Sequence, residues 1–215
     1  MSQAYFLTGT DTGVGKTLIA AALLRAAAAQ GLRALGMKPV AAGGDEDVDA
    51  LVAAGNVAAP RELINPYLLR EPLSPHLAAR RDGTAIDLEH VARCFNELRR
   101  RADFLVVEGA GGFRVPLSDT HDGADLAARL GLPVILVIGL RLGCLNHALL
   151  TAEAIRARGL PLAGWVANQV DPAMACVAEN VDTLRARLPA PLLGVVPFQD
   201  HPNPAQVATL LELPE

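Results

Sequence analysis

Short runs of consecutive apolar residues alternate along the chain with longer segments in which apolar residues recur every three or four positions. The short runs have the length of β-strands, and the longer segments have the period of amphipathic helices. Strands that are apolar on both faces are typical of parallel sheets covered by helices on each side. The pattern therefore predicts an α/β fold in which helices pack on both faces of one mostly parallel sheet.

The alternation predicts six strands and six helices. The strands are expected at 5–8, 33–38, 103–108, 133–138, 162–168 and 192–196, and the helices at 17–30, 88–101, 122–130, 146–158, 173–188 and 205–213. No internal repeat or linker divides them, so we expect a single domain over residues 1–215. The segment 55–84 is irregular, rich in proline and too long for a simple connection, which indicates a functional excursion.

Loops that follow parallel strands meet at one edge of a sheet. Ligands of open α/β sheets bind in the crevice at that edge, beside the carboxyl ends of the strands. We therefore expect the functional site among the loops that follow the predicted strands. Those loops begin after Thr8, Lys38, Glu108, Ile138, Asn168 and Val196.

A glycine-rich loop, Gly9-Thr-Asp-Thr-Gly-Val-Gly-Lys-Thr17, joins the first predicted strand to the first long helix. Its glycines allow backbone N–H groups to curl around phosphate oxygens, and the following helix adds the positive end of its dipole. Lys16 would reach the β- and γ-phosphates of a nucleotide, and the Thr17 hydroxyl would bind Mg²⁺. Five residues rather than the usual four separate Gly9 from Gly15, so the loop is a one-residue-longer variant of the common motif. With this loop between strand and helix, the α/β fold is expected to be of the P-loop NTPase type.

The basic residues add a second candidate. Of 19 basic residues, 17 are arginine, and the only lysines are Lys16 and Lys38. Two lysines in so arginine-rich a chain suggest positions where a compact ammonium is needed and a planar guanidinium would not fit. Lys38 ends the second predicted strand, so we expect its charge beside the phosphate loop.

Two groups of carboxylates are candidates for holding magnesium, which prefers oxygen ligands. Glu108 ends a buried strand and precedes Gly109-Ala-Gly-Gly112, whose backbone can approach a ligand closely. The second group follows Lys38 and consists of Asp45, Glu46, Asp47 and Asp49. Spacing alone does not decide whether one of these four binds metal or whether the group is a solvated surface run.

Charge and composition exclude several classes of protein. A net charge of −4 argues against a nucleic-acid-binding protein, which would normally present a basic face. The longest apolar runs, such as 133–138, are too short to span a bilayer, and residues 1–6 lack the features of a secretory signal. The three cysteines, Cys94, Cys144 and Cys176, form neither a disulfide framework nor a zinc motif. We therefore expect a cytoplasmic protein without nucleic-acid or membrane partners.

Six segments, in order along the chain, resemble the dethiobiotin synthetase family. They are the phosphate loop, Lys38-Pro-Val-Ala-Ala-Gly43, Pro72-Leu-Ser-Pro-His76, Val107-Glu-Gly-Ala-Gly-Gly112, Leu142-Gly-Cys-Leu-Asn-His147 and Gly164-Trp-Val-Ala-Asn168. Gly-Lys-Thr alone would be generic, but this conjunction is highly specific. The resemblance implies a homodimeric ligase of biotin biosynthesis. It would join CO₂ (or bicarbonate as its source) to 7,8-diaminopelargonate as a carbamate, phosphorylate the carbamate with ATP and close the ureido ring.

The resemblance also implies roles in catalysis and metal binding. Thr12 and Lys38 would contact the carbamate and the incoming γ-phosphate, and Lys16 would hold the phosphates. Thr17, Asp49 and Glu108 would bind Mg²⁺. Asp49 is chosen because Asp49-Ala-Leu51 matches a short motif of the family.

Binding residues follow from the same resemblance. ATP would be held by Gly13, Val14, Gly15, Lys16, Thr17, Leu18, Asp49, Glu108, Gly109, Ala110, Gly111, Asn168, Gln169, Pro197, Phe198 and Gln199. Within this set, adenine would lie against Asn168 and the segment 197–199. The organic substrate would be held by Thr12, Lys38, Ala42, Gly143, Cys144, Leu145 and Asn146. The last four would receive its distal carboxylate across the dimer, although Asn146 could instead cap a helix there.

Two positions depart from the family pattern, and two other functions compete with it. Ala42 stands where a serine often contacts substrate, and Asn180 replaces a tyrosine of some members. The main competing reading is a nucleotide-switch ATPase that positions cargo or assembles metal centres. Many such proteins carry a second lysine early in the phosphate loop, where this chain has Asp11. A different amide-forming or kinase-like P-loop enzyme is the third reading.

Overall fold

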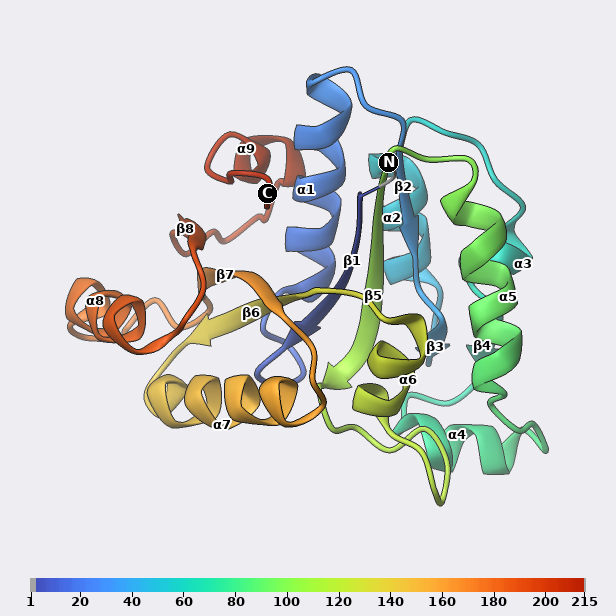
Figure 1. Ribbon diagram of the computed structural model, residues 1–215. Helices are drawn as coiled ribbons and strands as arrows, with labels where there is room; N and C mark the ends of the chain where they lie inside the picture. Colours follow the sequence, from blue (N-terminus) through green and yellow to red (C-terminus); the bar gives the residue numbers. More distant parts are fainter. Residues whose placement is uncertain (1–2, 215) are drawn as a thin grey trace.

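Six parallel strands form the central sheet of the computed structural model, which describes residues 3–214. In spatial order they are β2 (Ala34–Met37), β5 (Phe104–Gly112), β1 (Gln3–Gly9), β6 (Val134–Leu140), β7 (Leu162–Gln169) and β8 (Leu192–Val196) (Figure 1). Because every pairing is parallel, all six carboxyl ends lie at one edge. The predicted parallel sheet is confirmed.

Helices cover both faces of the sheet, as the apolar pattern predicts. One face carries α1 (Lys16–Ala29), α2 (Glu46–Ala54) and α9 (Pro204–Ala208), and the other carries α5 (Leu88–Arg99), α6 (Gly123–Leu130), α7 (Cys144–Ala157) and α8 (Val177–Arg187). Successive residues of a strand point to opposite faces. In β6, Ile135 therefore packs in the cluster of α1, whereas Leu136 packs in the cluster of α7.

Several helix boundaries differ from the sequence prediction, and three of these differences have a local structural cause. The helix α8 begins at Val177 rather than 173, because Asp171 Oδ1 accepts the N–H of Ala173 and holds a turn before it. The helix α9 ends at Ala208 rather than 213, since the chain then turns back onto β8, where Glu212 N–H donates to Leu193 O.

The third difference concerns the start of α7. This helix begins at Cys144 rather than at 146, and Gly143 occupies its N-cap position with φ of 95°. A residue with positive φ before a helix is most easily a glycine. Asn146 therefore lies inside the first turn, so the alternative interpretation that it caps the helix is wrong.

The proline-rich segment 55–84 contains α3 (Arg61–Ile64), β4 (Tyr67–Leu69) and α4 (Pro75–Arg81). Its strand β4 pairs in parallel with β3 (Val40–Ala42) in a second, two-stranded sheet. Periodicity did not predict β3 and β4, because three residues are too few to show an alternation. The pairing holds the segment beside the loop after Lys38.

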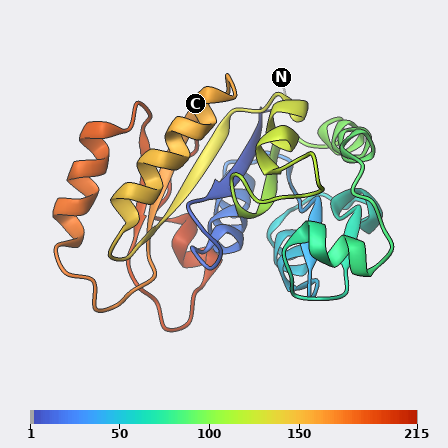
Figure 2. The ribbon, with the colours of Figure 1, turned by 90° about the horizontal axis from the view of Figure 1, so that it is seen from below.

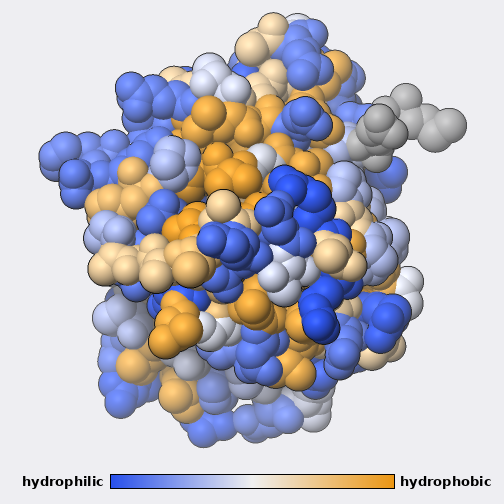
Figure 3. Space-filling view, turned by 90° about the vertical axis from the view of Figure 1, so that its left-hand side faces the viewer, coloured by the Kyte–Doolittle hydropathy of each residue, from blue (hydrophilic) through white to orange (hydrophobic). Residues whose placement is uncertain are grey.

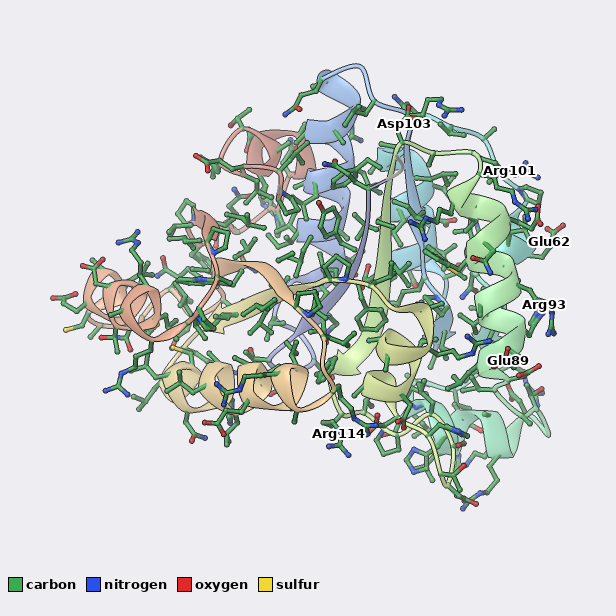
Figure 4. All side chains as sticks on the ribbon, in the orientation of Figure 1. Glu62, Glu89, Arg93, Arg101, Asp103 and Arg114 are labelled. Atoms are coloured by element: carbon green, nitrogen blue, oxygen red, sulfur yellow. The ribbon has the colours of Figure 1, made fainter. Side chains whose placement is uncertain are left out.

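The carboxyl edge of the sheet lies at the bottom of Figure 1. In Figure 4 the labelled Asp103, just before β5, stands at the top, and Arg114, just after β5, stands at the bottom. Figure 2 looks onto this edge, where the blue loop after β1 lies between α7 and the teal segment 55–84. The predicted meeting of the loops at one edge is confirmed.

The left-hand side of the molecule in Figure 1 is formed by α8, β8 and α9. In Figure 3 this side shows hydrophobic side chains among hydrophilic ones, and Val195, Phe198 and Leu210 are among the exposed apolar residues of this region. Within residues 3–214, no helix has both the length and the apolar character needed to cross a bilayer.

Candidate active site

The phosphate loop curls between β1 and α1 as predicted. Gly13 and Gly15 have φ of 73° and 88°, a conformation that side-chain-bearing residues rarely adopt. Lys16 is 7% exposed and folds back over the loop, with Nζ donating to the carbonyl oxygen of Asp11 at 2.9 Å. Burial lowers the pKa of Lys16 to about 8, against the opposing charge of Glu108. A bound polyanion would favour the charged form of this ammonium.

Four side chains from four elements meet beside this loop. Lys38 Nζ lies 2.6 Å from Glu108 Oε1 and 2.7 Å from Asp47 Oδ2. Thr17 Oγ1 lies 2.7 Å from Asp47 Oδ1 and 2.8 Å from Glu108 Oε1. The threonine hydroxyl has one proton, so it donates to one carboxylate at a time. We call Thr17, Lys38, Asp47 and Glu108 the Lys38 cluster.

Burial makes the charges of the Lys38 cluster depend on one another. Burial alone would lower the pKa of Lys38, but Glu108 and Asp47 outweigh it and raise that pKa. Complete burial raises the pKa of Glu108, although Lys38 opposes this effect. Asp47 is less buried, and the charge of Lys38 with the hydrogen bonds from Lys38 and Thr17 lowers its pKa despite desolvation. Lys38 therefore stays a cation between two acids.

The oxygen atoms of this cluster suit a hard divalent cation. Glu108 Oε2 is buried and has no hydrogen-bond partner among the described residues, so one oxygen is left over in a site that otherwise pairs its polar atoms. Within 3–214 no group of three or more His, Cys, Asp or Glu side chains could hold a metal by itself. Mg²⁺ commonly binds one or two carboxylates and completes its shell with phosphate oxygens and water. The residues present fit that ion.

Asp47 belongs to this cluster, whereas Asp49, the aspartate expected to bind metal and ATP, lies outside it. Asp49 Oδ1 instead pairs with Arg61 Nη1 at 2.7 Å, and the Asp49 side chain is 63% exposed. The two aspartates are two residues apart on α2, so their side chains point about 200° apart around the helix axis. Only one of them can face Thr17.

A cavity of about 740 Å³ opens above the cluster and the phosphate loop. It is lined by Thr12 and Ala42, as predicted for substrate contacts, together with Lys16, Lys38, Ala110 and Gly111. Residues 72–75 form another wall, so the proline-rich segment 55–84 contributes to the site. Glu46, a member of the second acidic group, also lines it, as does Val115, which the sequence analysis did not single out. The predicted ligand Gly109 instead faces the core, where an added Cβ would lie 3.1 Å from Phe6 Cζ.

A smaller cavity of about 230 Å³ lies on the other side of the phosphate loop. Gly13 and Gly15 line both cavities, so the loop separates them. The small cavity is mostly apolar and is formed by Leu18, residues 168–170, residues 196–199 and Pro202. The structure thus brings together the residues expected to hold adenine.

The predicted carboxylate-binding residues 143–146 stand apart from both cavities. They form the N-terminal end of α7, and none of them lines either cavity. Leu142, just before them, is 98% exposed. Arg141 joins this turn to the phosphate loop through an ion pair with Asp11. A single protomer therefore does not bring these residues to the Lys38 cluster.

Comparisons with known proteins agree with this geometry. A family model described as an AAA domain matches residues 3–206. The chain is 55% identical to ATP-dependent dethiobiotin synthetase BioD from Aromatoleum aromaticum, over 99% of this chain and 98% of that protein. It is 53% identical to the protein of the same name from Nitrosospira multiformis, over 99% of this chain and 96% of that protein.

Solved structures are similar in fold at much lower identity. The MinD cell division protein of Aquifex aeolicus has a TM-score of 0.57 at 15% identity, covering 93% of this chain and 84% of that chain. A ParA family ATPase from Chlorobium tepidum TLS has the same TM-score and identity, covering 93% and 85%. At such identity the likeness concerns the fold alone.

Proposed function

The chain belongs to the ATP-dependent dethiobiotin synthetase family, and we propose that its two cavities and the Lys38 cluster form the active site of this enzyme. It is accordingly an ATP-dependent ligase of biotin biosynthesis. The large cavity would take 7,8-diaminopelargonate, CO₂ and the triphosphate, and the small cavity would take adenine. One observation carries this proposal: Lys16 folds over the phosphate loop, and Lys38 pairs with two carboxylates beside that loop.

The proposed reaction has three steps. One amine of the diamine attacks CO₂ and loses a proton, which forms a carbamate. A carbamate oxygen then attacks the γ-phosphorus of ATP while the bond from that phosphorus to the bridging oxygen breaks and ADP leaves. The second amine attacks the carbonyl carbon of the resulting carbamic-phosphoric anhydride, loses a proton and expels phosphate as the ring closes.

The main difficulty of these reaction steps is the repulsion between negatively charged reactants, and the residues of the site can reduce it. A carbamate and a γ-phosphate are both anions, so bringing them together requires nearby cations and N–H donors. Lys16 and the loop N–H groups would hold the phosphates. Lys38 and Thr12, which line the same cavity, would hold the carbamate oxygen in line with the γ-phosphorus. The proline-rich wall 72–75 would shield the anhydride from water.

Magnesium fits the proposal as the partner of these residues. Thr17, Asp47 and Glu108 would hold it, with the orphaned Oε2 of Glu108 as one oxygen donor. When bound, the ion would neutralise phosphate charge in the transition state. Lys38 lies within 2.7 Å of both carboxylates that would face the ion, so its charge offsets theirs.

Phosphate release tests the proposed reaction most directly. With ATP, Mg²⁺ and bicarbonate, release should depend on added 7,8-diaminopelargonate, and product should appear in equal amount. Lys16→Ala should lower this release by at least about 100-fold, because the phosphates lose their main cation. The fold should persist, as circular dichroism would check. Release that ignores the diamine would favour a nucleotide-switch ATPase, and normal turnover in Lys16→Ala would exclude the loop assignment.

We also propose a homodimer in which residues 143–146 of one protomer bind the distal carboxylate of substrate held by the other. Two features support it: these residues lie outside the cavities of their own protomer, and the exposed Leu142 beside them would be covered. The N–H groups at the start of the 14-residue helix α7 suit a carboxylate. Sedimentation velocity at micromolar concentration should give a dimer. A monomer with full activity would refute the arrangement.

A further inference from the structure

Asn168 ties the end of β7 to the phosphate loop. Its side-chain Nδ2 donates to the carbonyl oxygen of Val14 at 2.9 Å, across 154 residues of sequence. The side chain is 5% exposed, so this bond is shielded from water. A backbone carbonyl can only accept a hydrogen bond, which means that the amide nitrogen, and not the amide oxygen, must face Val14.

The same side chain also fills space that only glycine leaves open. A Cβ added to Gly15 would lie 2.3 Å from Asn168 Nδ2, closer than real contacts allow. Gly15 moreover has φ of 88°, so the loop conformation already requires glycine there. Asn168 therefore contacts two consecutive residues of the phosphate loop, one through a hydrogen bond and one through packing.

Asn168 also lines the small cavity, which we call the base cavity because it would hold adenine. Leu18 and Phe198 line this 230 Å³ cavity with it. Val14 takes one of the two hydrogens on Nδ2, so the second N–H and the amide oxygen remain for a nucleobase. One amide group thus lies between the base cavity and the loop that would hold the triphosphate.

We propose that Asn168 is a positioning residue for phosphate binding, which holds the phosphate loop through Val14 whether or not a base is present. The inference rests on the proposed nucleotide site and deepens it. Losing the bond leaves the buried Val14 carbonyl without its partner, so the loop relaxes and its N–H groups no longer converge on phosphate. A residue that only reads the base would have no such effect.

A ligand without a base separates these two roles. Magnesium tripolyphosphate carries the phosphates alone, and adenosine carries the base alone. In calorimetric titrations, Asn168→Ala should weaken the binding of tripolyphosphate about tenfold, which corresponds to one buried hydrogen bond. It should weaken the binding of adenosine as well. Unchanged tripolyphosphate binding in this variant would overturn the proposal.

Gln169→Ala is the matched control. Gln169 lines the same cavity, but its Nε2 donates to the carbonyl oxygen of Asp171, within its own loop. This variant should weaken adenosine and leave tripolyphosphate binding unchanged. Equal losses of tripolyphosphate binding in both variants would mean a general disturbance of the cavity and would also overturn the proposal.

Asn168→Asp provides a second variant that keeps the volume of the side chain. It places an oxygen where Val14 needs a donor, so tripolyphosphate binding should fall at least as far as in Asn168→Ala. A lowered melting temperature with normal tripolyphosphate affinity would reduce Asn168 to a stabilising residue and contradict the inference. Because these titrations need no turnover, they remain informative even if the proposed ligase reaction fails.

Discussion

Replacing Lys38 by methionine should lower dethiobiotin formation by at least about 100-fold, the loss typical of removing one preorganised charge from a transition state. Methionine keeps the length of the lysine stem and removes only the ammonium. That ammonium is 2.6 Å from Glu108 and 2.7 Å from Asp47. Its loss would leave the γ-phosphate and the carbamate facing two carboxylates with one cation fewer. Coupled measurement of ADP and product would record the effect.

The same substitution should destabilise the fold. Glu108 is fully buried, and a buried charge that loses its partner costs about 3–5 kcal/mol. Uptake of a proton by Glu108 would relieve part of this cost, since burial already raises the pKa of that carboxyl. Urea unfolding at neutral pH should therefore give a clear loss of stability that shrinks as the pH is lowered.

Two controls separate charge from packing. Arg101→Ala removes an exposed cation that follows α5 and lies, with Asp103, toward the end of the sheet where β5 begins (Figure 4), so it should change activity less than twofold. Lys38→Arg keeps the charge, but the planar guanidinium is larger and the site is closed around a side chain that is 4% exposed. We expect it to rescue little activity. Full activity in Lys38→Met would remove Lys38 from the mechanism.

Asp47→Asn and Asp49→Asn should have very different effects, although both remove one charge from the same helix. Asp47→Asn should raise the magnesium concentration for half-maximal activity by about tenfold or more, because Mg²⁺ prefers charged oxygen ligands. Its turnover should also fall, since Thr17 and Lys38 lose a shared partner. Magnesium titrations of the ligase reaction would measure both quantities.

Asp49→Asn should stay within about twofold of the parent in the same titrations. It loses only an exposed ion pair with Arg61, and exposed pairs are worth about 0–1 kcal/mol. The reverse order, with Asp49 controlling the magnesium requirement, would show that α2 turns in solution to present its other side. The Asp47 assignment would then be wrong.

The parallel sheet and its covering helices followed from local pattern, whereas the order of the strands came only from the tertiary structure. Apolar runs such as 133–138 could only be strands buried on both faces, and parallel strands bring their carboxyl ends together by geometry. The phosphate loop was equally legible, because Gly13, Gly15, Lys16 and Thr17 act within one short stretch of chain. Glu108 and Lys38 could be anticipated for a related reason, because each ends a predicted apolar run. In the structure Lys38 lies just beyond β2, whereas β5 continues past Glu108 to Gly112.

The sequence pattern did not show which way a side chain points from a helix whose first residue is uncertain. Choosing between Asp47 and Asp49 needs the rotation of α2 relative to the sheet, and this is set by the packing of its buried residues Val48, Leu51 and Ala54. The strands β3 and β4 are too short to be predicted from an alternating pattern. The sequence therefore indicated that segment 55–84 is functional, but it did not show that residues 72–75 line the cavity. The bond from Asn168 to Val14 spans 154 residues and leaves no local trace.

The sequence by itself determined the layered sheet, the phosphate loop and the pair of lysines, because each depends on neighbours within one element or on the common edge of parallel strands. Only the tertiary structure decided which aspartate contacts Lys38, how the proline-rich segment forms a wall of the cavity, and how Asn168 bonds to the phosphate loop. Those features depend on the rotation and packing of elements far apart in the chain, and no short window of residues encodes them.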